Sequence, residues 1–429
     1  MHEGQFVYGV NTPYHLPSHS SLWGKHPMAP VIISVKVKAE YYMSKQIRLG
    51  VAGCGYWGPN LIRNFRALPD CQLSMMCDLD TSRLRHLQTL YPEVESATDY
   101  AHMLNGVNLD AVVIATSVAN HYPMAKAALL AGKHTFIEKP MASSAAHCEE
   151  LVAIARKNGL TLMTGHTFLY SSAVRKVQEI IRQGDIGEIR YICARRLNLG
   201  LFQKDINVAW DLAPHDLSII LALMGELPLS VNCQGSAHVT PGIEDVTTMC
   251  LTFAKQRSAI IHSSWLDPRK VREMTIVGSQ RMIVYDDLAP LEKIRVYDMR
   301  VERPPHYDTF GEFQYAYHYG DMNAPFITQE EPLKTECQHF LDCIQHDTQP
   351  LSCGTRGLEL VTILEASTES LRHDGAAVPL AKTFRAVAGK ASPANTSERL
   401  AAATLQANGS GCNRRSANAN GHARVRIAL

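Results

Sequence analysis

Three side chains that could move a proton stand in two short motifs of the sequence. Glu138-Lys139-Pro140 follows the apolar run His134 to Ile137, and Asp211 precedes His215 by four residues, on one face if the segment is helical. A carboxylate, an imidazole and a lysine together can accept the proton of a secondary alcohol as hydride leaves its carbon. Histidine suits this step because its pKa lies near neutral pH. Taken alone, such a lysine more often lies on the surface, and such an Asp–His pair is more often part of a helix cap. The surrounding sequence must therefore show whether the residues are catalytic.

A glycine-rich segment, Gly53-Cys54-Gly55-Tyr56-Trp57-Gly58, supplies that context. It follows the apolar run Ile47 to Ala52 and precedes a helix-like segment, as a dinucleotide-binding loop does. Gly53 permits the tight turn, Gly55 lets the backbone approach a pyrophosphate, and Gly58 lets the helix pack on the strand. The N-terminus of the helix then offers free N–H groups to the phosphates. A plain glycine turn is the alternative.

Asp78 completes this pattern. It ends the next predicted strand, twenty residues after Gly58, where an acid accepts hydrogen bonds from the adenosine ribose. A carboxylate at this place repels a 2′-phosphate, so we expect NAD rather than NADP as the cofactor. Arg83 and Arg85 lie one helical turn further on and keep the second option open.

Strands and helices alternate through the first half of the chain, which predicts a Rossmann fold with a doubly wound parallel sheet. The predicted strands are Leu73 to Cys77, Ala111 to Ala115, His134 to Ile137 and Thr161 to Thr164, besides Ile47 to Ala52. The predicted helices are Leu61 to Leu68, His121 to Ala131 and Ala145 to Lys157.

After residue 167 strands follow one another with few helices. They are Ile189 to Leu197, Thr247 to Phe253, Ala259 to Trp265 and Arg272 to Val277. This order predicts a C-terminal α+β domain with a largely antiparallel, open sheet, whose uncovered face would favour a homo-oligomer, a dimer or tetramer. An apolar helical run after Trp210 ends at Gly225, with Pro214 suited to a first helical turn. A final amphipathic pair, Lys334 to His346 and Gly357 to His373, closes the folded part.

Four segments follow from this organisation. Residues 1–45 form an N-terminal extension with scattered histidines and prolines, 46–167 the NAD-binding domain and 168–385 the substrate domain. Residues 386–429 shift to Ala, Ser, Asn and Gly, which cannot bury enough apolar surface to offset chain entropy. We therefore expect a flexible extension and a disordered tail.

Composition excludes several classes of function. The 429 residues carry a formal net charge of +1, which does not favour binding to nucleic acid or to a membrane surface. No apolar run approaches the ~18 residues of a membrane helix. The 11 cysteines include no C-x-x-C pair, and Cys337, His339 and Cys343 fit no usual zinc spacing, so we expect no metal and a cytoplasmic location.

The motifs in combination resemble the Gfo/Idh/MocA oxidoreductases, over roughly residues 45–385. The resemblance is carried by the GYWGPN loop, by Ala115-Thr116-Ser117 to His121, by Glu138-Lys139-Pro140 and by the spacing of Asp211 and His215. It implies that Lys139, Asp211 and His215 are catalytic. It also implies an NAD site made by Gly53, Gly55, Tyr56, Trp57, Gly58, Asp78, Thr116, Ser117, His121, Glu138 and Lys139. The family usually has glycine before the histidine, where this chain has Pro214.

A narrower resemblance concerns the substrate. Gly165 to Tyr170, Arg196 to Gly200 and Trp210 to Asp216 are similar to members that oxidise C3 of a UDP-linked hexose or hexuronate, often for an aminotransferase. It implies substrate contacts by His166, Tyr170, Arg196, Asn198 and Trp210, and a place in amino-sugar or lipopolysaccharide biosynthesis. Two basic clusters, Arg195, Arg196 and Lys204, and Arg269, Lys270 and Arg272, could bind a diphosphate. Solvated strand-edge charges explain them equally well.

Two other functions stay open. A dehydrogenase of a free polyol or sugar, such as an inositol, would not need the arginine clusters. A non-catalytic member could use the fold to sense NAD or a metabolite, since a fold does not determine function. Sensing requires no proton acceptor, so the joint presence of Lys139, Asp211 and His215 favours an enzyme.

Overall fold

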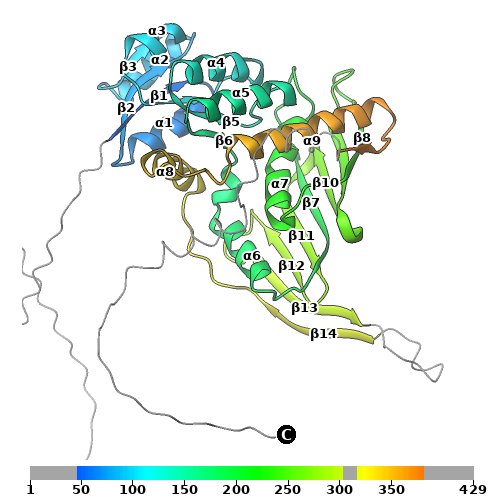
Figure 1. Ribbon diagram of the computed structural model, residues 1–429. Coiled ribbons are helices and arrows are strands. Elements are labelled where there is room, and N and C mark those ends of the chain that lie inside the picture. Colours follow the sequence, from blue (N-terminus) through cyan, green and yellow to red (C-terminus); the bar gives the residue numbers. More distant parts are fainter. Residues whose placement is uncertain (1–45, 303–315, 381–429) are drawn as a thin grey trace, which may run out of the picture. The chain divides into compact units, whose positions relative to one another are not determined.

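The computed structural model describes residues 46–302 and 316–380 and contains two sheets (Figure 1). The predicted extension 1–45 and tail 386–429 lie outside the described residues. The first sheet has six parallel strands in the order β3-β2-β1-β4-β5-β6. Its strands are β1 (Ile47–Ala52), β2 (Cys71–Cys77), β3 (Glu95–Ala97), β4 (Ala111–Ile114), β5 (His134–Glu138) and β6 (Leu162–Gly165).

The central strands of this sheet form because they are apolar on both faces. All four residues of β4 are buried, and β1 exposes only part of Arg48, as expected of strands covered by helices on both sides. The covering helices are α1 (Gly58–Arg66), α2 (Thr81–Leu90), α3 (Tyr100–Gly106), α4 (Val118–Leu130) and α5 (Ala145–Lys157). The Rossmann fold is confirmed, although α2, α3 and β3 carry no clear signal in the sequence.

The second sheet has nine strands in the order β14-β13-β12-β11-β7-β10-β9-β8-β15. Every neighbouring pair is antiparallel except β7 and β10, so the largely antiparallel prediction is confirmed. The strands are β7 (Ile189–Leu199), β8 (Ser230–Ser236), β9 (Val246–Thr252), β10 (Ser258–Ser264), β11 (Leu266–Gly278), β12 (Met282–Asp286), β13 (Ile294–Glu302), β14 (Ala316–Asn323) and β15 (Val378–Pro379).

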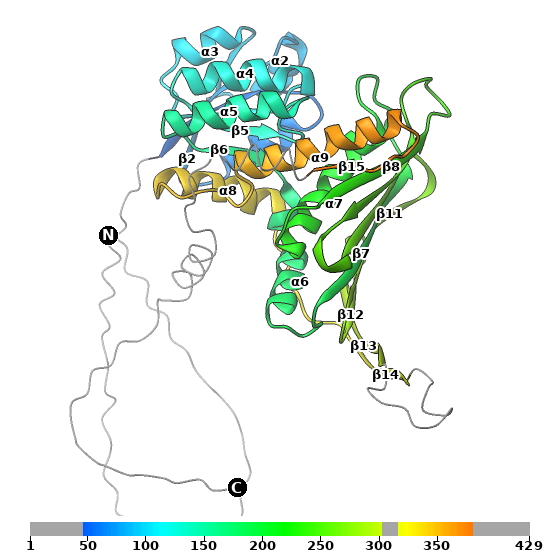
Figure 2. The ribbon, with the colours of Figure 1, turned by 45° about the vertical axis from the view of Figure 1, so that its right-hand side comes forward.

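Helices pack on one face of this sheet, as Figure 2 shows for α6, α7 and α9. Ile192, Ile261 and Met249 point toward them and are buried, whereas Cys193, Ile260 and Cys250 on the other face are only half-buried. The helical elements of this half are η1 (Thr167–Tyr170), α6 (Ser172–Arg182), α7 (Val208–Met224), η2 (Ala254–Gln256), α8 (Pro332–Gln345) and α9 (Gly354–Arg372). No described helix is long and apolar enough to cross a membrane.

Helix α7 begins earlier than the sequence predicts. The side chain of Asn207 caps it by accepting a hydrogen bond from the backbone N–H of Trp210, at 3.2 Å. Pro214 therefore lies inside the helix rather than in its first turn and cannot donate to the carbonyl of Trp210. The helix ends at Gly225, which takes the left-handed conformation as the sequence indicates (φ 67°).

The chain returns to the Rossmann domain at α8, so residues beyond 167 also contribute to the core of that domain. Phe65 of α1, Phe136 of β5 and Phe340 of α8 make three edge-to-face contacts, with ring centroids 5.7–6.3 Å apart. Leu333, Cys337 and Leu341 join the same buried cluster. Helix α8 therefore completes the core under β5, although it lies far along the chain from that strand.

Replacing Phe340 by Ala tests this packing. We expect the free energy of unfolding to fall by about 3–5 kcal/mol, because a fully buried ring is lost from a three-ring cluster. Chemical denaturation measures the change. Lys334→Ala, an exposed position of the same helix, should stay within about 0.5 kcal/mol of the parent protein. A similar small loss in both variants would contradict the proposed role of α8 in the Rossmann core.

Candidate active site

The glycine loop joins β1 to α1 at the carboxyl end of the parallel sheet, as predicted. Gly53 has φ 98°, and a Cβ there would lie 2.5 Å from the carbonyl oxygen of Ala115. A Cβ at Gly58 would overlap the carbonyl oxygen of Gly53. At Gly55 the only atom near such a Cβ is a side-chain nitrogen of Arg83, 3.5 Å away. The loop therefore has the close backbone packing of a dinucleotide cradle and an open approach at its middle glycine.

Two aromatic residues of the loop and the acid after β2 complete this part of the site. Tyr56 is 87% exposed and Trp57 is 37% exposed, so both can contact a ligand. Asp78 accepts hydrogen bonds from the backbone N–H groups of Cys54 (2.6 Å) and Asp80 (2.8 Å), which fixes its carboxylate beside the loop. Arg83 lies 3.8 Å from it. Asp78 thus holds the loop in shape, and each of its oxygens keeps a second lone pair for a ribose hydroxyl.

The segment after β4 is held in place by His121. The ring of His121 is buried, with Nδ1 2.8 Å from the carbonyl oxygen of Pro140 and Nε2 3.1 Å from that of Thr116. Ser117 caps α4 and is exposed. Thr116 and Ser117 therefore follow the carboxyl end of β4, and His121 joins two loops through both ring nitrogens. The predicted contact of His121 with the cofactor stays a prediction.

Lys139 and Asp211 meet across the two domains. The ammonium of Lys139, directly after β5, donates to the backbone oxygen of Asp211 (2.8 Å) and lies 3.2 Å from its carboxylate Oδ1. Both side chains are about one-fifth exposed, at 20% and 23%. The other carboxylate oxygen of Asp211 accepts from the indole N–H of Trp265, at 3.2 Å. The predicted catalytic lysine and aspartate are thus brought together, on a buried tryptophan that the sequence does not single out.

His215 lies one turn beyond Asp211 on α7 and has an unusual electrostatic environment. Its Nδ1 is buried and accepts or donates no hydrogen bond among the described residues. Burial, reinforced by the positive charges of Lys139, Arg196 and Arg272, holds the pKa of His215 well below its usual value. The ring contacts Phe168 edge-to-face, with centroids 5.0 Å apart. The imidazole is therefore neutral at physiological pH and available to accept a proton.

Glu138 lies under the glycine loop, next to Lys139. Its carboxylate accepts hydrogen bonds from the indole N–H of Trp57 (2.8 Å) and the backbone N–H of Lys139 (3.2 Å). Burial raises the pKa of Glu138 to about 7, against the opposing effect of the Lys139 ammonium. Glu138 therefore couples the glycine loop to the turn that carries Lys139.

The five predicted substrate contacts differ in their burial and in their hydrogen-bond partners. His166 is buried beside the Lys139 turn, neither ring nitrogen has a described partner, and burial lowers its pKa to about 4. Asn198 is half-buried near the end of β7. Tyr170, in contrast, is buried with its hydroxyl on Ser352 Oγ (3.0 Å), and Trp210 donates to Thr368 Oγ1 (2.9 Å). Tyr170 therefore packs in the buried cluster around Phe340, and Trp210 joins α7 to α9, while their predicted contacts with the substrate stay predictions.

Arg196 is engaged within the protein. Its guanidinium forms a bidentate ion pair with Asp216, at 2.8 and 2.9 Å, and both side chains are buried. It also lies over the ring of Phe168, 4.5 Å from the centroid. Its predicted contact with the substrate stays a prediction. Of the other cations in the two basic clusters, Arg195, Lys204, Arg269 and Lys270 are exposed, and Arg272 is half-buried beside Asp287.

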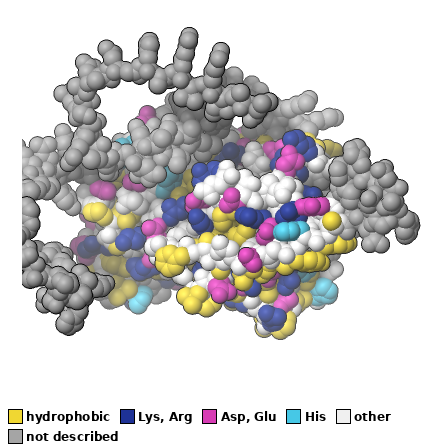
Figure 3. Space-filling view, turned by 90° about the horizontal axis from the view of Figure 1, so that it is seen from below, with side chains coloured by type: hydrophobic (Ala, Val, Ile, Leu, Met, Phe, Trp, Pro, Cys, Tyr) yellow, Lys and Arg dark blue, Asp and Glu magenta, His cyan; other side chains and the backbone are white. Residues whose placement is uncertain are grey.

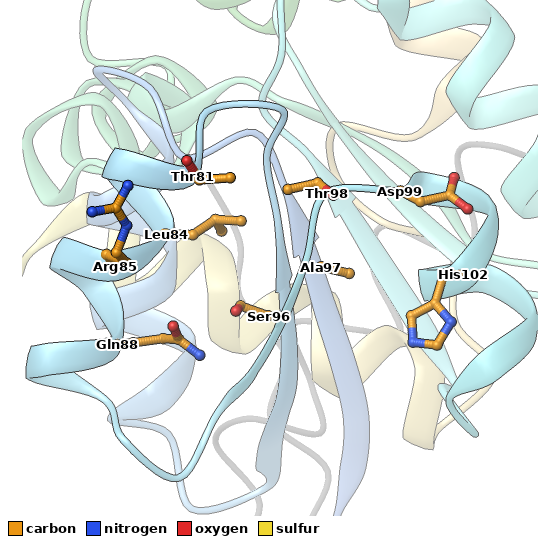
Figure 4. Close-up of a pocket in the computed structure, with 9 residues that line it drawn as sticks. All are labelled: Thr81, Leu84, Arg85, Gln88, Ser96, Ala97, Thr98, Asp99 and His102. Atoms are coloured by element: carbon orange, nitrogen blue, oxygen red, sulfur yellow. The ribbon is translucent and has the colours of Figure 1, made fainter.

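The surface carries side chains of both charges, and one groove lies apart from the Lys139–Asp211 pair. On the face in Figure 3, hydrophobic side chains alternate with side chains of both charges, consistent with a net charge of +1. A groove of about 470 Å³ lies beside the edge strand β3, between Arg85 and Gln88 of α2 and His102 of α3 (Figure 4). It adjoins the predicted ribose ligand, because the N–H of Asp78 donates to the oxygen of Ala97 in its lining. The described residues contain no group of three or more His, Cys, Asp or Glu arranged to hold a metal.

The fold and this site define an NAD-dependent oxidoreductase that acts on CH–OH groups. Residues 47–166 match a family described as an oxidoreductase family with an NAD-binding Rossmann fold, and residues 174–284 match the GFO/IDH/MocA C-terminal domain. The two matches together span more than half of the chain. The protein belongs to the Gfo/Idh/MocA oxidoreductase family, which confirms the resemblance and the NAD cofactor.

Individual relatives differ in substrate. The UDP-N-acetylglucosamine 3-dehydrogenase of Acidithiobacillus ferrooxidans is 29% identical over 56% of this chain and 74% of its own length. A solved structure of that enzyme matches with a TM-score of 0.63 at 25% identity, covering 77% of this chain and 99% of the other. The D-apiose dehydrogenase of Paraburkholderia graminis is 24% identical over 77% of this chain and 88% of its own.

Two alanine substitutions in the glycine loop should separate folding from cofactor binding. We expect Gly58→Ala to lower the melting temperature and abolish NAD binding, because the new methyl overlaps the backbone of Gly53. Gly55→Ala should fold normally but bind NAD at least about 10-fold more weakly, since only a ligand approaches that position closely. Thermal melting and NAD titration measure both effects. Unchanged NAD affinity in Gly55→Ala would mean that the pyrophosphate does not cross the loop there.

Proposed function

We propose that the protein oxidises a secondary hydroxyl, at C3, of a nucleotide-linked sugar such as UDP-N-acetylglucosamine. The 3-dehydrogenase relative with that substrate supports the proposal. So do the exposed cations Lys204, Arg269 and Lys270 of the second domain, which could contact a diphosphate, whereas Arg195 lies on the face of β7 opposite Arg196. The ketone product would suit an aminotransferase, in amino-sugar or cell-surface glycan biosynthesis.

One observation carries the chemistry: Lys139 is ion-paired with Asp211, and one turn further along α7 lies the neutral imidazole of His215, whose buried Nδ1 has no described partner. His215 can accept the hydroxyl proton because its low pKa keeps it neutral. Lys139, held by Asp211, can donate to the same hydroxyl oxygen and stabilise negative charge as the proton leaves. Asp211 holds the lysine in place and is itself held by Trp265.

The cofactor would be held by the glycine loop, Asp78 and the Trp57–Glu138 pair. NAD⁺ bound there supplies the acceptor for the hydride of the sugar carbon. Glu138 and His166 are both buried near Lys139, which limits the access of water there. The protonation states of these two side chains set the local charge around the lysine. The low pKa of His215 then favours release of the proton after each turnover.

A free polyol or sugar is the second candidate, and the structure provides one reason for it. Arg196, the most central cation of the predicted diphosphate site, is committed to Asp216. A substrate without phosphates would need none of the exposed cations. The D-apiose dehydrogenase relative shows that the family includes enzymes named for a free sugar.

NADH formation with a panel of substrates decides between them. We expect NADH absorbance to appear with NAD⁺ and a UDP-linked hexose, and not with free inositols, apiose or hexoses. Turnover of a free polyol alone would move the second candidate to first place. Absence of turnover with every compound would contradict both, unless an added 2-oxo acid showed that bound NADH must be reoxidised in place.

Lys139→Met tests the proton chemistry. We expect kcat to fall about 100-fold or more, because the ammonium that stabilises the forming alkoxide is lost. NAD affinity should change little, since no hydrogen bond of the glycine loop involves the lysine side chain. Lys126→Met is the matched control and should retain activity, because it removes a lysine of α4 that is ion-paired only with Glu150 of α5 among the described acids. Near-normal kcat in Lys139→Met would remove the lysine from the mechanism.

A further inference from the structure

A second buried carboxyl group lies beneath the active-site turn. Glu336 of α8 is fully buried, in the helix that closes the Rossmann core. Its Oε2 accepts a hydrogen bond from the hydroxyl of Thr167, at 2.7 Å, while Oε1 has no partner among the described residues. Thr167 directly follows His166 at the start of η1. The mechanism above makes no use of this carboxyl.

The groups that face Glu336 are acidic or neutral. Burial raises the pKa of Glu336, and the charge of Glu138 of β5 raises it further, against the opposing hydrogen bonds from Thr167 and the His166 backbone. Tyr170 of η1 and Cys337 of α8 are the other titratable groups that Glu336 influences. Glu336 forms no ion pair within residues 46–302 and 316–380. Two carboxylates in one buried site cannot both ionise at moderate pH without such compensation.

The two carboxyls differ in the hydrogen bonds they accept. Glu138 has two N–H donors, from Trp57 and Lys139, and lies near the Lys139 ammonium, all of which favour its charged form. Glu336 accepts from the Thr167 hydroxyl and the His166 backbone, but its Oε1 has no described partner and no described cation is paired with it. When one proton remains in the pair, it therefore belongs on Glu336.

We propose that Glu336 is a positioning residue that holds a proton beneath Glu138. The pair then carries at most one negative charge, and Glu138 keeps that charge for Trp57 and the Lys139 turn. Gly165, opposite Glu138 in β6, leaves just enough room for this arrangement, since a Cβ there would lie 3.0 Å from the Glu138 carboxyl. This inference concerns the protein side of the cofactor site and does not depend on which sugar is oxidised.

Proton linkage in the apo protein tests the proposal. Unfolded Glu336 ionises near pH 4, whereas the folded form keeps its proton, so the stability of the wild type falls as pH rises. Glu336→Gln is neutral in both states and lacks this loss. We expect the folding equilibrium constant of Glu336→Gln, relative to wild type, to rise about tenfold per pH unit between roughly pH 5.5 and 8. Urea denaturation at a series of pH values measures it.

A control on the same helix separates this effect from removal of any carboxylate. Glu331 is exposed and ion-paired with Arg63, which helps to lower its pKa, so it is ionised in both states over this range. Glu331→Gln should therefore show the same pH slope as wild type. Equal slopes for Glu336→Gln and wild type would overturn the proposal, because Glu336 would then be ionised in the folded protein.

Kinetics test the positioning role separately. Glu336→Gln should keep kcat/KM for NAD⁺ within about threefold of wild type, since its amide oxygen can still accept from Thr167. Glu336→Ala should raise KM for NAD⁺ more than it lowers kcat, because Trp57 and Glu138 lose their support while Lys139 and His215 remain. A Gln variant as impaired as the Ala variant would contradict a neutral Glu336. If the Ala variant does not fold, the pH slope of Glu336→Gln decides alone.

Discussion

The ion pair between Lys139 and Asp211 is the contact on which the active site depends. It joins the turn after β5 to the first turn of α7, and so links the Rossmann domain to the second domain at the point of chemistry. Because both charges are largely removed from water, loss of either would leave the other uncompensated. Trp265 holds the carboxylate from behind. His215 is then placed one helical turn away, where its neighbours are cations.

Burial then decides the charge of each group around that contact. His215 and His166 are kept neutral because burial and the nearby Lys139 ammonium both oppose a further positive charge. Glu138 is a borderline acid for the opposite reason, since burial opposes its negative charge while Lys139 favours it. The charge of Lys139 thus lowers the pKa of three histidines, His121 included, and opposes the rise in the pKa of one carboxyl. Two neutral imidazoles and one carboxyl that titrates near neutral pH are arranged around a permanent cation, and the described residues contain no set of metal ligands.

Local sequence pattern predicted most elements of the fold, and the failures have a common cause. Strand β1 and helix α5 match their predicted limits, because a buried run or an amphipathic stripe stands between clear end signals. Strands β13 and β14 carry no comparable signal and are not predicted, and helix α6 is not predicted although Val174, Val177 and Ile180 recur at helical spacing. Helix α8 is predicted as a helix, but its partners Phe65 and Phe136 lie more than two hundred residues earlier in the chain. No local pattern indicates such a contact.

The sequence by itself determined the residue types that chemistry needs, their order, and the glycine loop with its acid, since these depend on backbone geometry over a few residues. Tertiary structure decided which polar groups are engaged by partners within the protein. Arg196 is taken up by Asp216, His121 by two backbone carbonyls, and Tyr170 by Ser352. Glu336 was visible only as an acid among Leu333, Cys337 and Phe340 on an apolar helix face. Its partners come from other elements of the fold. Only in the folded chain is the water removed that would otherwise weaken the interactions between these charged groups.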